Sequence, residues 1–441
     1  MYISYSPVIA GLTRNLLHLI LFVCFIGVFY SCKTKQTNAD SGIALLSVTH
    51  IEQTVRSFSD AVQAKDTALV MPLVSPNFAV ATTTRPSSRN YLQTIFEREL
   101  IDSITLAADI AVVPKGLFKQ EVGALVHLSG REPVKTNITF DGRDGTILYV
   151  DYFDSLYGLF RDRPARLMAT LAIEQDEESS AIIVYLKLNS YDKPLRFLFD
   201  SGADGMAVSS ELAAKAGVKA SLSQTASVVG GNAQILVSSG NTVHLDSLQL
   251  QNQNIAIFEK VRNNIDGLIG LNLAKNFIVK VNFDEKKMYL YSFGTYEYEA
   301  AGATESITVP RGIIIIPGYL NLTGKDTVSG NFIFDTGAEY HFMGFSHFVR
   351  EHRLLLSGFK PVNQSATTSM GITTPVYEGT AVAFGFGKSI KQTEMPVSLQ
   401  ASSGNSNWRP PADASIGIKL INNYNFTINL LEKEIHFTPR K

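Results

Sequence analysis

The chain is poor in cysteine and in net charge, and each absence excludes a class of protein. Cys24 and Cys32 are its only cysteines among 441 residues. Two are too few for a disulfide framework, a thiolate zinc site or an iron–sulfur cluster. The 39 basic and 40 acidic side chains leave a formal net charge of −1. The sequence therefore lacks the excess of basic residues that would indicate a nucleic-acid partner. Hydrophobic residues still make up 45% of the chain, which is typical of folded domains, and at ~150 residues per domain the length predicts about three.

Long hydrophobic runs are also rare, and the clearest one lies near the N-terminus. Residues 16–29 are mostly apolar, a length that suits a signal-peptide core and is shorter than the ~20 residues of a membrane-spanning helix. Ser31 and Cys32 follow, and then a polar segment. A small residue before a cysteine at the end of such a run resembles a bacterial lipoprotein processing site.

That resemblance predicts a signal peptide over residues 1–31, a lipid on Cys32 and a flexible tether over 32–44. The protein would then be lipid-anchored to a membrane of the bacterial cell envelope, as a periplasmic or outer-membrane lipoprotein. An uncleaved anchor, or an ordinary signal peptide with a chance cysteine, is the alternative.

The residue pattern over 45–165 predicts a separate α+β module. Thr49 and Glu52 fit a capping box, and apolar residues follow at helical spacing. After Ser103, strand-like runs alternate with Gly, Pro and Asp-Gly turns, and the last of these runs covers 146–153. This order of elements is similar to the NTF2-like fold. The module carries no catalytic set, so we expect a spacer or interaction domain, with a small-ligand module as the alternative.

A duplicated pattern follows. Asp200-Ser-Gly-Ala-Asp204 recurs as Asp335-Thr-Gly-Ala-Glu339, 135 positions later, and each string ends an apolar run. A second pair repeats downstream, Asp266-Gly-Leu-Ile-Gly270 and Asp413-Ala-Ser-Ile-Gly417. One such string is an ordinary strand ending, but two copies with the same downstream partner indicate two related halves.

These strings resemble the retropepsin-like signature of the aspartic protease family, and two on one chain resemble the bilobal, pepsin-like arrangement. The resemblance implies a mainly β fold, a bilobal double β-barrel with a cleft between lobe 1 (166–298) and lobe 2 (299–441). It also implies aspartic endopeptidase activity on a peptide or protein substrate, with no cofactor and no metal.

The resemblance assigns the chemistry to Asp200 and Asp335. Two carboxylates about 3 Å apart cannot both ionise easily, so they share a proton. One then acts as general base on a water molecule while the other protonates the scissile carbonyl. The residues expected to support this dyad are Ser201, Gly202, Thr336 and Gly337. The residues expected to contact substrate are Ala203, Asp204, Ala338, Glu339 and the hairpin-tip glycines Gly230, Gly231 and Gly371.

The sequence also departs from the family pattern. Leu271 and Ile418 stand where retropepsins have an arginine that braces the acidic residue, so the bracing of Asp204 and Glu339 is lost or replaced. A catalytically silent, peptide-binding envelope lipoprotein is therefore the second hypothesis. Other chemistries lack their motifs, since the sequence has no His-Glu-x-x-His, no P-loop and no Gly-x-Ser-x-Gly.

Overall fold

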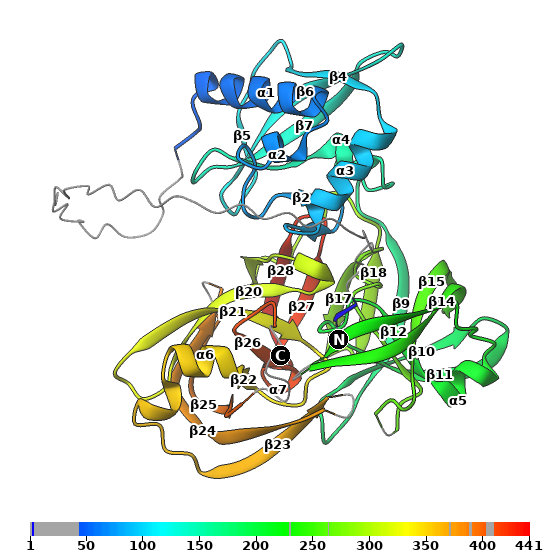
Figure 1. Cartoon of the computed structure of the whole chain (residues 1–441), viewed down its shortest axis with the longest axis vertical. Coiled ribbons are helices and arrows are strands. Elements are labelled where there is room, and N and C mark those ends of the chain that lie inside the picture. The colour runs from blue at the N-terminus through cyan, green and yellow to red at the C-terminus, as the bar shows by residue number, and fades with distance from the viewer. Residues whose placement is uncertain are drawn as a thin grey trace, which may run out of the picture.

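The computed structural model describes residues 2–3, 44–228, 231–262, 264–369, 372–387, 390–402 and 410–441. Most of the predicted signal peptide, together with Cys32, Gly230 and Gly371, lies outside these residues. The fold is mainly β. A smaller N-terminal domain lies above a larger β body (Figure 1). Among the described residues, no helix has the length and apolar character needed to cross a membrane.

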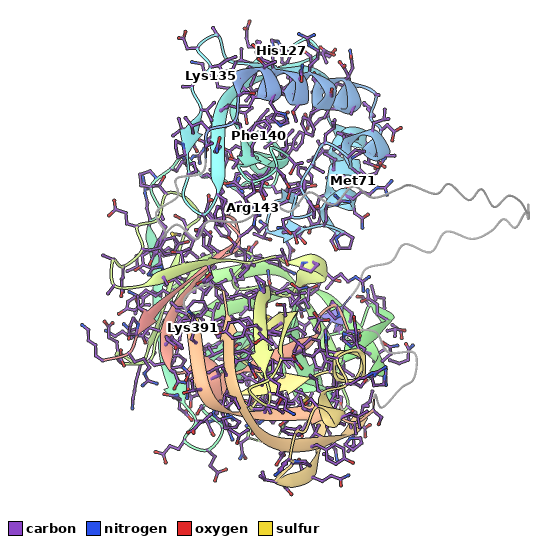
Figure 2. All side chains as sticks on the ribbon, turned by 90° about the vertical axis from the view of Figure 1, so that its left-hand side faces the viewer. Met71, His127, Lys135, Phe140, Arg143 and Lys391 are labelled. Atoms are coloured by element: carbon purple, nitrogen blue, oxygen red, sulfur yellow. The ribbon has the colours of Figure 1, made fainter. Side chains whose placement is uncertain are left out.

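The N-terminal domain packs helices against an antiparallel sheet. Its helices are α1 (Val48–Gln63), α2 (Thr67–Val70), α3 (Ser88–Arg98) and α4 (Asp151–Ser155). Its strands are β2 (Ala79–Val80), β3 (Thr83–Thr84), β4 (Ile101–Leu106), β5 (Val113–Pro114), β6 (Lys119–Leu128), β7 (Val134–Asp141) and β8 (Ile147–Val150). Ile51, Val55 and Phe58 on α1 are at most 2% exposed, because their spacing puts them on one helix face against the sheet. Phe140, labelled in Figure 2, is fully buried in the same core.

Two local predictions for this domain are wrong. The N-cap of α1 is Ser47, whose hydroxyl accepts a hydrogen bond from the His50 backbone N–H, so Thr49 lies inside the helix. The predicted strand over 146–153 ends at Val150, and residues Asp151–Ser155 form α4. Apolar residues at both helical and alternating positions made this short run ambiguous, and tertiary packing decided it.

The first half of the body contains a closed barrel. Its six barrel strands are β10 (Ile182–Leu188), β11 (Tyr191–Phe199), β12 (Met206–Ser209), β14 (Gly231–Leu245), β15 (Leu248–Phe258) and β16 (Gly267–Ile269). They follow the order β14-β15-β12-β16-β11-β10, and β10 pairs back to β14 to close the ring. Strand β13 (Leu222–Val228) forms a hairpin with β14, the two-residue β1 (Tyr2–Ile3) pairs with β13, and α5 (Ser210–Lys215) follows β12.

The second half repeats this pairing pattern. Its elements are η1 (Pro310–Gly312), β20 (Ile315–Asn321), β21 (Thr327–Asp335), β22 (Phe342–Gly344), α6 (Ser346–Glu351), η2 (Leu354–Leu356), β23 (Asn363–Ser369), β24 (Ile372–Phe386), β25 (Ile390–Gln400), β26 (Ala414–Gly417) and α7 (Ile418–Ile421). Strand β21 runs parallel to β26, and β22 runs antiparallel to β26 and parallel to β25. Strands β11, β16, β12 and β15 have the same relations in the first half. The duplicated sequence strings therefore occupy equivalent places in two related units.

A further set of strands joins the two halves. The order β9-β18-β17-β27-β28-β19 is antiparallel throughout. The first half supplies β9 (Leu167–Gln175), β17 (Ile278–Asn282) and β18 (Lys287–Tyr291). The second half supplies β19 (Ala303–Ser306), β27 (Tyr424–Asn429) and β28 (Glu434–Pro439). One large hydrophobic cluster contains buried side chains from both halves, so the halves are fixed to each other by packing.

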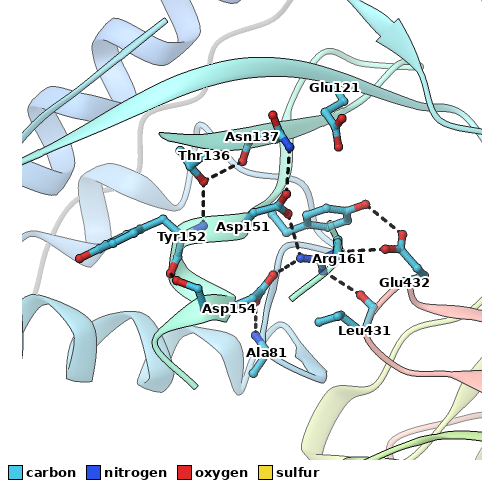
Figure 3. A network of polar contacts seen from close by, with 12 residues as sticks. Ala81, Glu121, Thr136, Asn137, Asp151, Tyr152, Asp154, Arg161, Leu431 and Glu432 are labelled. Carbon is cyan, nitrogen blue, oxygen red and sulfur yellow. Dashed lines mark hydrogen bonds and ion pairs between the residues drawn. The ribbon is translucent and has the colours of Figure 1, made fainter. Parts of the chain in front are cut away.

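The turn between β27 and β28 docks into the N-terminal domain (Figure 3). Arg161 is 8% exposed and pairs with Asp151, Asp154 and Glu432, and its guanidinium also donates to the Leu431 carbonyl at 2.8 Å. Lys119 Nζ pairs with Glu432 and Glu434. Burial alone would raise the pKa of Glu432. The charges of Lys119 and Arg161 outweigh this effect and lower the pKa of Glu432 to about 2. The two parts are thus joined by a buried, charge-paired contact.

Candidate active site

The two aspartates end equivalent strands of the two halves. Asp200 directly follows β11, and Asp335 is the last residue of β21. Each strand lies beside the short strand that carries the Ile-Gly pair. Gly270 lies directly under the Ala203 carbonyl and Gly417 under the Ala338 carbonyl, with no room for a Cβ at either position. The Ile-Gly elements therefore pack beneath the two aspartate-bearing loops.

The two loops are joined by reciprocal hydrogen bonds. The Ser201 backbone N–H donates to Thr336 Oγ1 at 2.9 Å, and the Thr336 N–H donates to Ser201 Oγ at 3.0 Å. The Ser201 hydroxyl donates to the Phe334 carbonyl at 2.7 Å, and the Thr336 hydroxyl donates to the Phe199 carbonyl at 2.8 Å. Ser201 and Thr336 are fully buried. Because all of these groups are satisfied only by the opposite loop, the network fixes the two loops relative to each other.

The carboxyl groups of Asp200 and Asp335 lie against each other's loops. The Gly202 N–H donates to Asp200 Oδ1 at 2.9 Å, and the Gly337 N–H donates to Asp335 Oδ1 at 3.0 Å. A Cβ on Gly202 would overlap the Asp335 carboxyl, and a Cβ on Gly337 would overlap that of Asp200. The two carboxyl groups also lie close enough together for each to affect the protonation of the other. The glycines thus permit the close approach that a shared proton requires.

The electrostatics of the pair favour a bound proton. Burial, the negative charge of Asp200 and the hydrogen bond that protonated Asp335 can donate to Asp200 together raise the pKa of Asp335 to about 8. Tyr340 lies near the pair. Burial and the charge of Asp335 raise the pKa of its phenol well above the usual range. The raised pKa of Asp335 favours its protonated form at neutral pH, and a carboxyl group that keeps its proton can act as an acid toward a carbonyl.

This titration predicts how cleavage should depend on pH. If this proton serves as the general acid of peptide cleavage, as the family resemblance implies, its loss should lower kcat/KM about tenfold per pH unit above pH ~8. Stability should fall as pH rises from about 4 to about 8, because the unfolded Asp335 releases its proton near 3.8 while the folded one retains it. A pH–rate profile and urea titrations over the same range measure both. A cleavage rate still rising at pH 10 would contradict the assignment.

The acidic residues four positions after each aspartate have new partners. Asp204 pairs with Lys275 Nζ, which also donates to the Asp204 carbonyl at 3.1 Å. Glu339 pairs with Arg262 of the other half, and its side chain is 44% exposed. Lys275 and Arg262 thus replace the bracing arginine that Leu271 and Ile418 do not supply.

The two predicted hairpins are present. Val228 pairs with Gly231 at the end of the β13–β14 hairpin, and Ser369 pairs with Ile372 at the end of β23–β24. The tip glycines Gly230 and Gly371 lie outside the described residues. The contact of these hairpins with substrate stays a prediction.

Three residues near the site were missed by the sequence reasoning. Lys275 follows its Ile-Gly pair by five positions, a basic residue close enough along the chain to have been tested as a partner for Asp204. Arg262 approaches Glu339 from the other half, and Tyr340 directly follows Glu339 without belonging to the repeated string. Neither Arg262 nor Tyr340 could be identified from the neighbouring sequence, because their contacts depend on how the two halves pack.

Comparison with known families agrees with the geometry. Residues 184–273 match the family model described as aspartyl protease. That segment includes Asp200 and its Ile-Gly element but ends before Asp335. No curated protein matches the chain. The chain therefore contains an aspartyl protease-like domain.

Proposed function

We propose that the protein is an aspartic endopeptidase in which Asp200 and Asp335 activate water to hydrolyse peptide bonds. One observation carries the proposal: the two Asp-Ser/Thr-Gly-Ala loops are joined by reciprocal hydrogen bonds, and the glycine of each loop lies against the carboxyl group of the other loop. A structural role alone gives no reason to keep two partly buried carboxyl groups so close together, because like charges that are partly desolvated oppose folding.

The proposed reaction uses one proton shared by the pair. The ionised carboxylate takes a proton from water as the water oxygen bonds to the scissile carbonyl carbon. The protonated carboxyl gives its proton to the carbonyl oxygen, which forms a neutral tetrahedral diol. As the diol collapses, one of its hydroxyl groups returns its proton to the pair and the C=O bond re-forms. The C–N bond breaks, and the leaving nitrogen takes a proton from the pair. The products are a carboxylic acid and an amine, and the pair regains its starting protonation.

Substrate would bind between two barrel-like lobes. The cyclic strand order of the first half and its repetition in the second support a bilobal double barrel over 166–298 and 299–441. The β13–β14 and β23–β24 hairpins would act as flaps over an extended peptide, with Ala203, Ala338 and Gly231 near its backbone. The helices-then-sheet order of residues 45–165 supports an NTF2-like domain whose role is to hold the peptidase body.

Mapping of new peptide termini tests the proposal. The purified protein is incubated with an unfolded protein and a peptide library, with and without a statine-type mimic of the tetrahedral diol. We expect new termini in extended segments, suppressed by the mimic and unaffected by a metal chelator. Tight binding of the mimic without any new termini would instead favour a catalytically silent peptide-binding protein. The divergence between Gly267-Leu268 and Ala414-Ser415 is the feature that favours this second function.

We also propose that the protein is a lipid-anchored lipoprotein of the bacterial cell envelope. The apolar run before Ser31-Cys32 supports this. Replacement of the acceptor sulfur in Cys32→Ser should remove acylation and move the protein from the membrane fraction to the soluble fraction. Fractionation and immunoblotting measure this, and unchanged membrane association of the variant would exclude an anchor at Cys32.

A further inference from the structure

Asp204 is covered by a short segment from the other half. The segment 309–312 connects the linking strands to β20 and contains η1. Gly312 lies so close to the Asp204 carboxylate that a Cβ there would overlap it, and its φ of +74° suits glycine. Arg311 beside it also has a positive φ, of +53°. With Lys275 on its other side, Asp204 is left 14% exposed, so the position of Gly312 determines how much of this carboxylate a substrate can reach.

The N-terminal domain holds this segment in place. The Val309 backbone N–H donates to Thr84 Oγ1 at 2.9 Å, and the Thr84 N–H donates to the Val309 carbonyl at 3.2 Å. The Thr83 hydroxyl donates to the same carbonyl at 3.0 Å. Thr84 is 1% exposed and Val309 is fully buried. These bonds join the β2–β3 hairpin to the segment three residues before Gly312.

The same hairpin is attached to the body at a second point. Lys433 Nζ, in the β27–β28 turn, donates to the Ala81 carbonyl at 2.8 Å. The Ala81 N–H donates to Asp154, which pairs with Arg161. The hairpin is therefore fixed on both sides by buried polar contacts, and it cannot shift without breaking them. A movement of segment 309–312 would have to break the contacts of Thr83 and Thr84 as well.

We infer that the N-terminal domain helps to position the side of the proposed active site that contains Asp204, and that Thr84 is a positioning residue for this side. The contacts run from Thr84 to Val309, along the segment to Gly312, and on to Asp204. The other side differs, since Glu339 is more exposed and is paired with Arg262. The domain thus restricts substrate binding on one side of the scissile bond only. This inference rests on the proposed peptidase function.

Thr84→Val removes the acceptor for the Val309 N–H while keeping the side-chain shape. Thr82→Val is the matched control, because Thr82 is buried in the same turn and takes no part in the bonds to Val309. The substrates are peptides cut at one bond and extended on one side or the other. We expect Thr84→Val to raise KM about fivefold, the effect of roughly one hydrogen bond, for extension on one side only. The kcat for the shortest peptide should not change. Equal kinetics for the two variants, or an equal change on both sides, would overturn the inference.

Hydrogen–deuterium exchange separates this inference from the proposed function. In Thr84→Val, amides of 309–316 and of the Asp204 loop should exchange faster than in Thr82→Val, even if the wild-type protein cleaves no peptide. If the protein cleaves no peptide, that result counts against the peptidase function. Hydrogen–deuterium exchange would still test whether Thr84 is coupled to the Asp204 loop. Unchanged exchange in the Asp204 loop would overturn the coupling. If Thr84→Val does not fold, Thr83→Val replaces it, because the Val309 carbonyl then keeps its bond from the Thr84 N–H.

Discussion

Asp200→Asn and Asp335→Asn should each abolish peptide cleavage while leaving the protein folded. Either change removes one of the two groups that exchange protons with water and the scissile carbonyl, so we expect kcat/KM to fall at least about a thousandfold. Asparagine keeps the shape of aspartate, and its carbonyl oxygen can still accept the hydrogen bond from the Gly202 or Gly337 N–H. Cleavage of a fluorogenic peptide, measured on protein with an unchanged circular dichroism spectrum, gives the result.

The stability of these variants provides a second readout. Asp335→Asn removes a buried group whose ionisation is opposed by Asp200, so the free energy of unfolding at neutral pH should stay the same or rise. Asp192→Asn is the control, since the Asp192 side chain is 91% exposed and pairs only with Lys187 on the surface. It should change neither rate nor stability. Wild-type cleavage in either the Asp200 or the Asp335 variant would refute the dyad.

Arg161→Gln should strongly destabilise the attachment of the N-terminal domain. Arg161 satisfies Asp151, Asp154 and Glu432 and lies over the Tyr149 ring at 3.7 Å. Asp154 is 1% exposed, so loss of the guanidinium leaves a buried carboxylate without its cation. Removal of one partner from a buried ion pair costs about 3–5 kcal/mol. Urea denaturation and limited proteolysis of the connection 156–166 should both show the loss.

Arg163→Gln is the matched control for this prediction. Arg163 lies two positions away and is exposed, and its guanidinium stacks on Phe160 at 3.6 Å. An exposed cation–π contact contributes about 0.5–1 kcal/mol, so this variant should change stability far less. Similar urea midpoints for the two variants would show that the buried network does not hold the domains together.

The duplicated strings allowed much of the site to be predicted from the sequence. A strand that ends in Asp and turns at Gly has a local signature, and its second copy indicated that Asp200 and Asp335 belong together. These features were readable because the residues that specify each loop are neighbours in the chain.

Contacts between distant segments could not be predicted in this way. Lys119 and Glu432 are 313 positions apart, and neither lies in a motif. Arg262 reaches Glu339, and Thr84 reaches Val309, only because the halves and the N-terminal domain pack as they do. Each such pair is one of many that the charges and hydroxyls of the sequence allow, and burial selects among them.

The central claim is that Asp200 and Asp335 form one proton-sharing site for a tetrahedral diol. A crystal structure of the protein with a bound statine-type mimic tests it most directly. We expect the hydroxyl of the mimic to lie between the two carboxyl groups, within hydrogen-bond distance (~2.6–3.2 Å) of both. A hydroxyl bound elsewhere, or carboxyl groups more than ~6 Å apart in the complex, would contradict it.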